Sequence, residues 1–246
     1  MIHCSLAETG IWRAMGQCLS GELTVTAFDL PGHGRSAQWD ARGEMGAVCS
    51  DIAADFAQEH GPLDVIGHSF GGVVALRLAS RRPDLVRSLV MIEPVFFAAG
   101  LRTRPDACRE HLAEFAAFNA AMAANDLTAA ARGFIGDWGG GRPWDSFSDT
   151  AQARITAQMP LIAAASPTLY DDAGGLLEPG VLEAIDIPTL LLEGSETRRI
   201  IPAINAALAD RLPRARRSVI KDAGHMSVAT HACEVSAEVL RFLNET

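Results

Sequence analysis

The sequence predicts an α/β fold in which a mostly parallel sheet carries helices on both of its faces. Short apolar segments that suit buried strands alternate along the chain with longer segments whose apolar residues recur at helical spacing. The alternation stops after residue 97 and resumes near residue 187, which indicates a helical region inserted into the core. A chain of 246 residues is long enough for one such core and an insert.

The first part of the chain alternates between predicted strands and predicted helices. Strands are expected at 23–28, 63–66 and 86–92, and helices at 12–19, 45–60 and 73–79. Glycine and proline separate these segments, as at Gly61-Pro62.

The second part opens with two Ala-rich helical stretches, 105–135 and 149–169, and no strand. Strands at 187–192 and 218–220 and helices at 202–212 and 232–243 then restore the alternation. We therefore expect a core made of residues 1–97 and 181–246, with a helical insert over 98–180.

Charge and apolar runs narrow the classes of partner. The formal net charge of −9 argues against nucleic acid or an anionic membrane as a partner. No apolar stretch approaches the roughly 20 residues that cross a bilayer. The N-terminus lacks a basic stretch followed by an apolar run, so no signal peptide is expected.

The cysteines predict a reducing environment. They are odd in number and scattered, and none has C-x-x-C or metal-ligand spacing. We expect them to be free thiols in the cytoplasm. They are Cys4, Cys18, Cys49, Cys108 and Cys233.

A serine lies where a predicted strand turns sharply into a predicted helix. The segment from Gly67 to Gly72 has the G-x-S-x-G pattern, with Ser69 at its centre. Glycines on either side let strand and helix approach closely, and the turn presents the Ser69 hydroxyl above the strand end. This pattern predicts a nucleophile rather than an incidental serine in a turn.

A serine hydroxyl needs a base within hydrogen-bond reach. His225 follows the last predicted strand, and the carboxyl ends of parallel strands share one edge of the sheet, so His225 and Ser69 are expected to meet. His33, in an earlier strand-end loop, is the rival. The other histidines are expected to be a spacer in the turn (His68), surface residues (His60 and His111) and a solvated residue near the closing helix (His231).

These motifs together resemble the α/β-hydrolase fold family. The chain has the turn Gly67-His68-Ser69-Phe70-Gly71-Gly72, the segment from Asp29 to Ser36 (DLPGHGRS), and the closing Gly224-His225. His3-Cys4 matches the His-Gly pair of the family, and the order of serine, acid and histidine agrees. The resemblance implies that the insert is a cap over the active site.

The start of the chain departs from this family. Only Met1 and Ile2 precede His3, where the family usually has two strands and most of a third. We expect either a truncated start or a version without these strands. Residues 23–28 would then form an exposed sheet edge, which a second copy of the chain could cover.

The acid of the triad also departs from the family. Its usual position, three residues after Gly194, holds Thr197, which has no carboxylate. Glu196 lies in the same loop, and Glu93 ends the strand after the turn helix, where some family members carry the acid. We favour Glu93, because a carboxylate at the end of a buried strand needs a partner, and keep Glu196 as the alternative.

The resemblance assigns the oxyanion hole to backbone N–H groups, one from Phe70 and one from Ser5, with Leu6 next. Apolar residues of the insert are candidates for an acyl pocket, or they simply pack the insert on the core. These residues are Phe134, Trp138, Trp144, Met159 and Leu161.

The expected function is hydrolysis of a carboxylic ester or lactone through an acyl-enzyme. The same triad also supports C–C bond hydrolysis, thioester hydrolysis or hydroxynitrile lyase chemistry, and a catalytically weak ligand-binding member of the fold is a further alternative. No cofactor and no metal are expected, and the partner is a small-molecule substrate.

Overall fold

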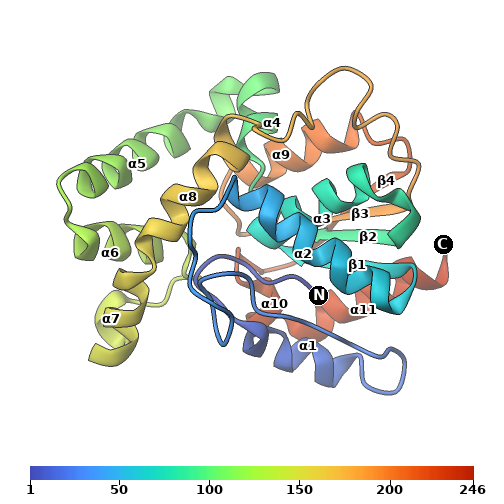
Figure 1. Cartoon of the computed structure of the whole chain (residues 1–246), viewed down its shortest axis with the longest axis horizontal. Helices are drawn as coiled ribbons and strands as arrows, with labels where there is room; N and C mark the ends of the chain where they lie inside the picture. Colours follow the sequence, from blue (N-terminus) through green and yellow to red (C-terminus); the bar gives the residue numbers. More distant parts are fainter.

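A four-stranded parallel sheet forms the centre of the molecule, in a computed structural model that describes residues 1–246 apart from the side chain of Ala107. The strands lie in chain order, and each neighbouring pair is parallel (Figure 1). They are β1 (Leu63–His68), β2 (Val86–Ile92), β3 (Thr189–Gly194) and β4 (Ala215–Ile220).

Helices cover both faces of the sheet, because apolar side chains along each strand point to opposite faces in turn. In β2, Leu89 and Met91 pack on one face, and Val90 and Ile92 pack on the other. The first face lies against α2 (Met45–His60), α3 (Phe70–Arg81) and α9 (Ile200–Ala209). The second lies against α1 (Arg13–Cys18) and α11 (Ala232–Asn244).

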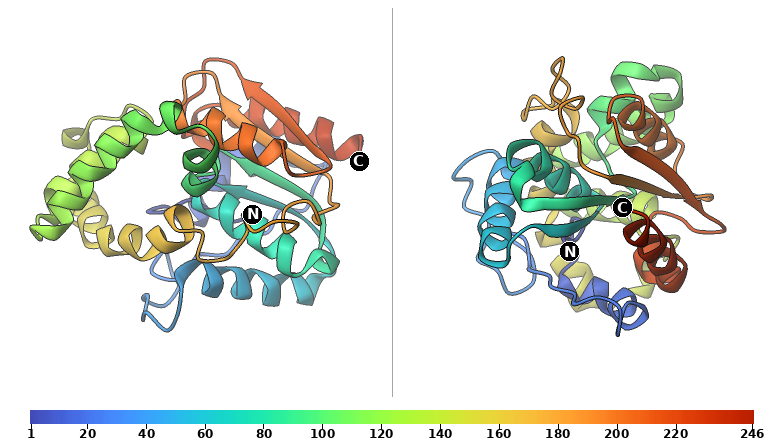
Figure 2. Two further views of the ribbon diagram at one scale, coloured as in Figure 1. Left: turned by 90° about the horizontal axis from the view of Figure 1, so that it is seen from above. Right: turned by 90° about the vertical axis from the view of Figure 1, so that its right-hand side faces the viewer.

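The segment between β2 and β3 is helical, and no strand occurs in its described part. Helix α4 packs against α9 in the main core, whereas α5–α8 stand beyond one end of the sheet and share an apolar cluster of their own (Figure 2). The helices are α4 (Phe97–Thr103), α5 (Pro105–Ala123), α6 (Leu127–Trp138), α7 (Asp149–Ala157) and α8 (Met159–Tyr170).

Short helices complete the chain. They are η1 (Thr9–Trp12), η2 (Pro83–Leu85), η3 (Trp144–Ser146) and α10 (Ser227–Thr230).

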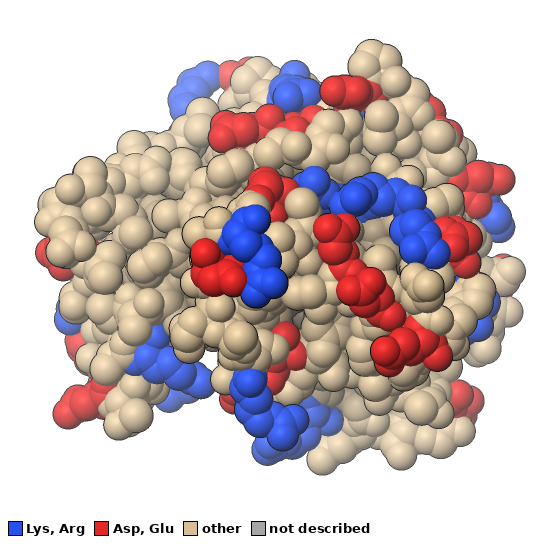
Figure 3. All heavy atoms as spheres, viewed as in Figure 1, with Lys and Arg blue, Asp and Glu red and all other residues tan. Residues whose placement is uncertain are grey.

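On the face in Figure 3, acidic and basic side chains are interspersed, and the part over α5–α8 carries few charges.

The strand expected at 23–28 does not form. This segment is extended, but its pairing in the sheet is limited to an isolated bridge between Phe28 and Ile2, which also bridges Gly67 of β1. A single bridge cannot support a ladder, so the segment stays outside the sheet. A cavity of about 290 Å³ lies between residues 22–28 and β1. The N-terminal side of the sheet is therefore shortened, as the sequence predicts.

Two of the cysteines form a disulfide, so the expectation of five free thiols is wrong. Cys18 at the end of α1 is bonded to Cys233 at the start of α11, with Cα atoms 5.3 Å apart. Because α1 and α11 pack on the same face of the sheet, residues 215 positions apart in the chain become neighbours. Cys4, Cys49 and Cys108 are free and buried.

None of the described helices is long and apolar enough to cross a membrane.

We expect the double variant Cys18→Ser, Cys233→Ser to unfold at a lower temperature than the native chain, because the disulfide restricts the unfolded state. The loss of stability should be roughly 2–4 kcal/mol. The unsubstituted chain, denatured without a reductant, should react with three equivalents of a thiol reagent. A reductant should lower the unfolding temperature of the native chain and leave that of the variant unchanged; five reactive thiols without reduction contradict the pairing.

Candidate active site

The turn between β1 and α3 holds Ser69 in a strained backbone conformation, with φ of 56° and ψ of −119°. The glycines beside it are required by close packing. A Cβ on Gly67 would lie 2.2 Å from the carbonyl oxygen of Gly71, and one on Gly71 would lie 2.2 Å from that of Ile2. The turn therefore holds the serine at the carboxyl end of β1, as its sequence pattern predicts.

Three side chains from three strand ends meet at this turn. His225, in the loop after β4, has its Nε2 3.1 Å from Ser69 Oγ and its Nδ1 3.1 Å from Glu93 Oε2. The exposed fractions of Ser69, His225 and Glu93 are 7%, 6% and 0%. A hydroxyl, an imidazole and a carboxylate are thus linked in the order needed for proton transfer.

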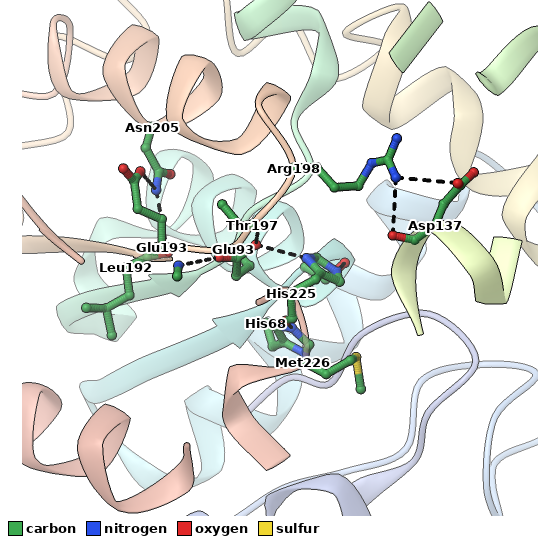
Figure 4. A network of polar contacts seen from close by, with 12 residues as sticks. His68, Glu93, Asp137, Leu192, Glu193, Thr197, Arg198, Asn205, His225 and Met226 are labelled. Carbon is green, nitrogen blue, oxygen red and sulfur yellow. Dashed lines mark hydrogen bonds and ion pairs between the residues drawn. The ribbon is translucent and has the colours of Figure 1, made fainter. Parts of the chain in front are cut away.

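Glu93 follows β2 directly and has a left-handed backbone, with φ of 52°. The N–H of Gly194 donates to its Oε1 at 2.6 Å, and the Thr197 hydroxyl donates to its Oε2 (Figure 4). The residue at the usual acid position therefore holds the carboxylate instead of supplying it. Glu196 is exposed and accepts a hydrogen bond from Ser195, so it does not reach His225.

The expected oxyanion donors differ in availability. Phe70 is the first residue of α3, so its N–H has no acceptor within the helix. Ser5 lines the cavity beside Ser69. The N–H of Leu6 donates to His33 Nε2 at 3.0 Å, so Leu6 is already engaged and is not a donor for an oxyanion.

His33, the rival base, is 1% exposed and bonded at both ring nitrogens. Its Nδ1 donates to the carbonyl of Pro31 at 2.9 Å, which leaves Nε2 to accept from Leu6. Burial lowers the pKa of His33, which favours this neutral form. His33 thus holds the loop that carries Ser5, a role that sequence reasoning missed.

Two other histidines are placed differently from expectation. His68, expected as a spacer, is fully buried and bonded through Nε2 to the carbonyl of His225. His111, expected on the surface, is 5% exposed and bonded to the Tyr170 hydroxyl at 2.8 Å. It lies on α5, whose Ala-rich sequence hides which face turns inward.

A cavity of about 80 Å³ opens beside Ser69 and His225. Aromatic side chains form much of its wall, and the ring of Trp138 lies 4.7 Å from that of His225. Of the expected pocket residues, Phe134 and Trp138 line it. The aromatic side chains of the wall are Phe97, Phe115, Phe118, Phe134, Trp138 and Tyr170.

Trp144 and Met159 do not line this cavity. Both are buried in the apolar cluster of α6–α8, because they face the neighbouring helices of the insert. Leu161 packs on the main core beside Gly32. The sequence shows which residues of the insert are apolar but not which face each helix turns toward Ser69.

Charged side chains lie at one side of the cavity. Arg198 pairs with Asp137 at 3.4 Å (Figure 4) and also pairs with Glu114, and both carboxylates line the cavity. Burial raises the pKa of Asp137. Among the described side chains, no group of three or more histidine, cysteine, aspartate or glutamate residues is arranged to hold a metal ion.

Comparison with known proteins identifies the family of the chain. A family model described as the alpha/beta hydrolase fold matches residues 1–232. The chain belongs to the alpha/beta hydrolase fold family. The match covers all four strands and the helices α5–α8 that lie between β2 and β3.

Individual proteins match the chain over only part of its length or at low identity. Lipase LipV of Mycobacterium tuberculosis is 42% identical over 104 residues, which cover 42% of this chain and 39% of that protein. A pimeloyl-acyl-carrier-protein methyl ester esterase of Neisseria meningitidis serogroup B is 29% identical, over 85% of this chain and 78% of that protein. The crystal structure of NosK from Streptomyces actuosus has a TM-score of 0.69 at 23% identity, over 99% of this chain and 96% of that one, and shows the same fold.

We expect a fluorophosphonate probe to label Ser69, because His225 is within hydrogen-bond distance to activate its hydroxyl. Intact-mass spectrometry of the folded protein should show one adduct, and Ser69→Ala should show none. Labelling that persists in Ser69→Ala would place the reactive nucleophile elsewhere.

Proposed function

We propose that the chain is a serine hydrolase that cleaves a carboxylic ester or lactone through an acyl-enzyme. The observation that carries the proposal is the hydrogen-bonded series Ser69, His225 and Glu93 beside an apolar cavity. The names of LipV and of the Neisseria esterase support ester substrates. The helices α5–α8 act as a cap that selects the substrate.

In the first half-reaction, Ser69 Oγ attacks the substrate carbonyl and passes its proton to His225 Nε2. Glu93 accepts from Nδ1–H and stabilises the imidazolium that forms. The N–H groups of Phe70 and Ser5 stabilise the oxyanion. His225 then protonates the leaving alcohol, and in the second half-reaction it activates a water that attacks the acyl-enzyme and releases the acid.

The decisive experiment measures hydrolysis of a short-chain nitrophenyl ester by the native chain and by Ser69→Ala. Turnover that Ser69→Ala abolishes supports the esterase proposal. A folded native chain that binds esters without turning them over favours the ligand-binding alternative. Turnover confined to a diketone or a thioester would favour C–C hydrolysis or thioester hydrolysis on the same triad.

We also propose that a second copy of the chain pairs with the sheet edge at β1, beside the cavity that residues 22–28 line. The cytoplasmic location stays a prediction, and the Cys18–Cys233 disulfide weighs against it, because reducing compartments keep most thiols unpaired.

Glu93→Gln should lower kcat by about two to four orders of magnitude, because an amide cannot stabilise the imidazolium of His225 in the same way. Glu196→Gln is the matched control, since this exposed side chain accepts a hydrogen bond from Ser195 and makes none to His225 among the described residues. Both variants are assayed on the same ester. If Glu196→Gln causes the larger loss, the assignment of the acid to Glu93 is wrong.

Trp138→Ala should change the preferred acyl length, because the Trp138 ring forms cavity wall next to His225. Trp144→Ala is the control, since Trp144 packs inside the cap and should lower stability without moving the preference. The measurement is kcat/KM for a series of nitrophenyl esters. An unchanged profile for Trp138→Ala would mean that this side chain only packs the cap.

A further inference from the structure

His68 is the last residue of β1 and immediately precedes Ser69. Its side chain is fully buried and lies beside that of His225 (Figure 4). The two ring centroids are 5.1 Å apart, and the Trp12 ring lies 6.4 Å from the His68 ring. The His68 side chain therefore contacts the loop that carries His225 but does not line the substrate cavity.

One hydrogen bond joins the His68 side chain to the backbone of the loop that carries His225. His68 Nε2 is 2.8 Å from the carbonyl oxygen of His225. A carbonyl accepts, so Nε2 carries the proton and Nδ1 of the neutral ring does not. Nδ1 is buried without a partner, and among the described residues no other donor reaches this carbonyl.

Burial, followed by the influence of His225, lowers the pKa of His68 to about 3. The His68 ring is therefore uncharged in the folded protein at neutral pH. It can donate to the carbonyl without placing a second positive charge beside His225, which itself becomes charged during turnover.

This arrangement is costly for a side chain that only fills space. A buried polar atom without a partner destabilises the fold, and an apolar side chain of similar size would avoid that cost. The hydrogen bond to His225 is what an apolar side chain could not supply. Because His68 and Ser69 are adjacent on one rigid strand end, that bond ties the base to the backbone of the nucleophile.

We propose that His68 is a positioning residue, which holds the backbone of His225 so that its imidazole stays in line between Ser69 and Glu93. The proposal rests on the hydrolase function proposed above. The loop from β4 to α10 carries His225, and without this bond the distance from Nε2 to Ser69 Oγ depends on that loop and on the hydrogen bond to Glu93. A displacement of a catalytic group by about 1 Å can lower the reaction rate by the order of 100-fold.

The test compares two substitutions at one position. His68→Leu removes the donor, and His68→Gln keeps an N–H donor at similar reach. On a nitrophenyl ester, His68→Leu should lower kcat about 10- to 100-fold with KM changed little, since the substrate cavity is untouched. His68→Gln should recover most of kcat. Trp12→Phe, which alters packing on the same ring and keeps the bond, should have near-native kcat.

Several results would overturn the proposal. A folded His68→Leu with native kcat, or a His68→Gln as slow as His68→Leu, assigns the histidine to packing alone. If His68→Leu does not fold, nitrogen NMR of the native chain decides, because a charged His68 or a proton on Nδ1 contradicts the donor role. A native chain without ester turnover refutes the hydrolase proposal instead, and the NMR result then tests the hydrogen bond by itself.

Discussion

The buried carboxylate of Glu93 is the interaction on which the rest of the site depends. A charge without solvent must be paired and hydrogen-bonded, or the fold loses several kcal/mol. Here the partners come from the end of β3, from the loop that follows it and from the loop after β4. Satisfying one carboxylate therefore brings separate strand ends together and brings His225 to Ser69.

Close backbone approach is the second requirement. Ser69 reaches His225 only because α3 begins directly above the end of β1, and side chains at Gly67 or Gly71 would collide with backbone carbonyls. The same contact seats the segment that carries Ser5 against α3. The proposed nucleophile and the expected oxyanion donors thus share one tightly packed unit, which suits groups that must not move relative to one another.

The sequence was informative wherever the constraint is local. The turn at Ser69 is read from consecutive residues, and Glu93 is indicated by a carboxylate at the end of an apolar strand. Pairings across the chain leave no such signal: Cys18 and Cys233 are joined only because α1 and α11 share a face, and residues 23–28 lack the neighbour that would make them a strand. For a related reason, the sequence does not show that Trp144 and Met159 lie away from the cavity. Apolar spacing shows that a helix is buried but not against which surface.

The histidines around the site divide into His225, which becomes charged in the proposed mechanism, and others that stay neutral. Burial lowers the pKa of His3 to about 4 and, together with His225, lowers that of His68 to about 3, and it also lowers the pKa of His33. Each of these rings exchanges hydrogen bonds with backbone groups: His3 with Cys4 and Leu30, His33 with Pro31 and Leu6, and His68 with His225. A neutral imidazole can donate at one nitrogen and accept at the other, which lets it bridge two loops without adding charge. In the proposed mechanism, the positive charge that develops on His225 therefore has no like charge among these three rings to oppose it, and Glu93 can stabilise it.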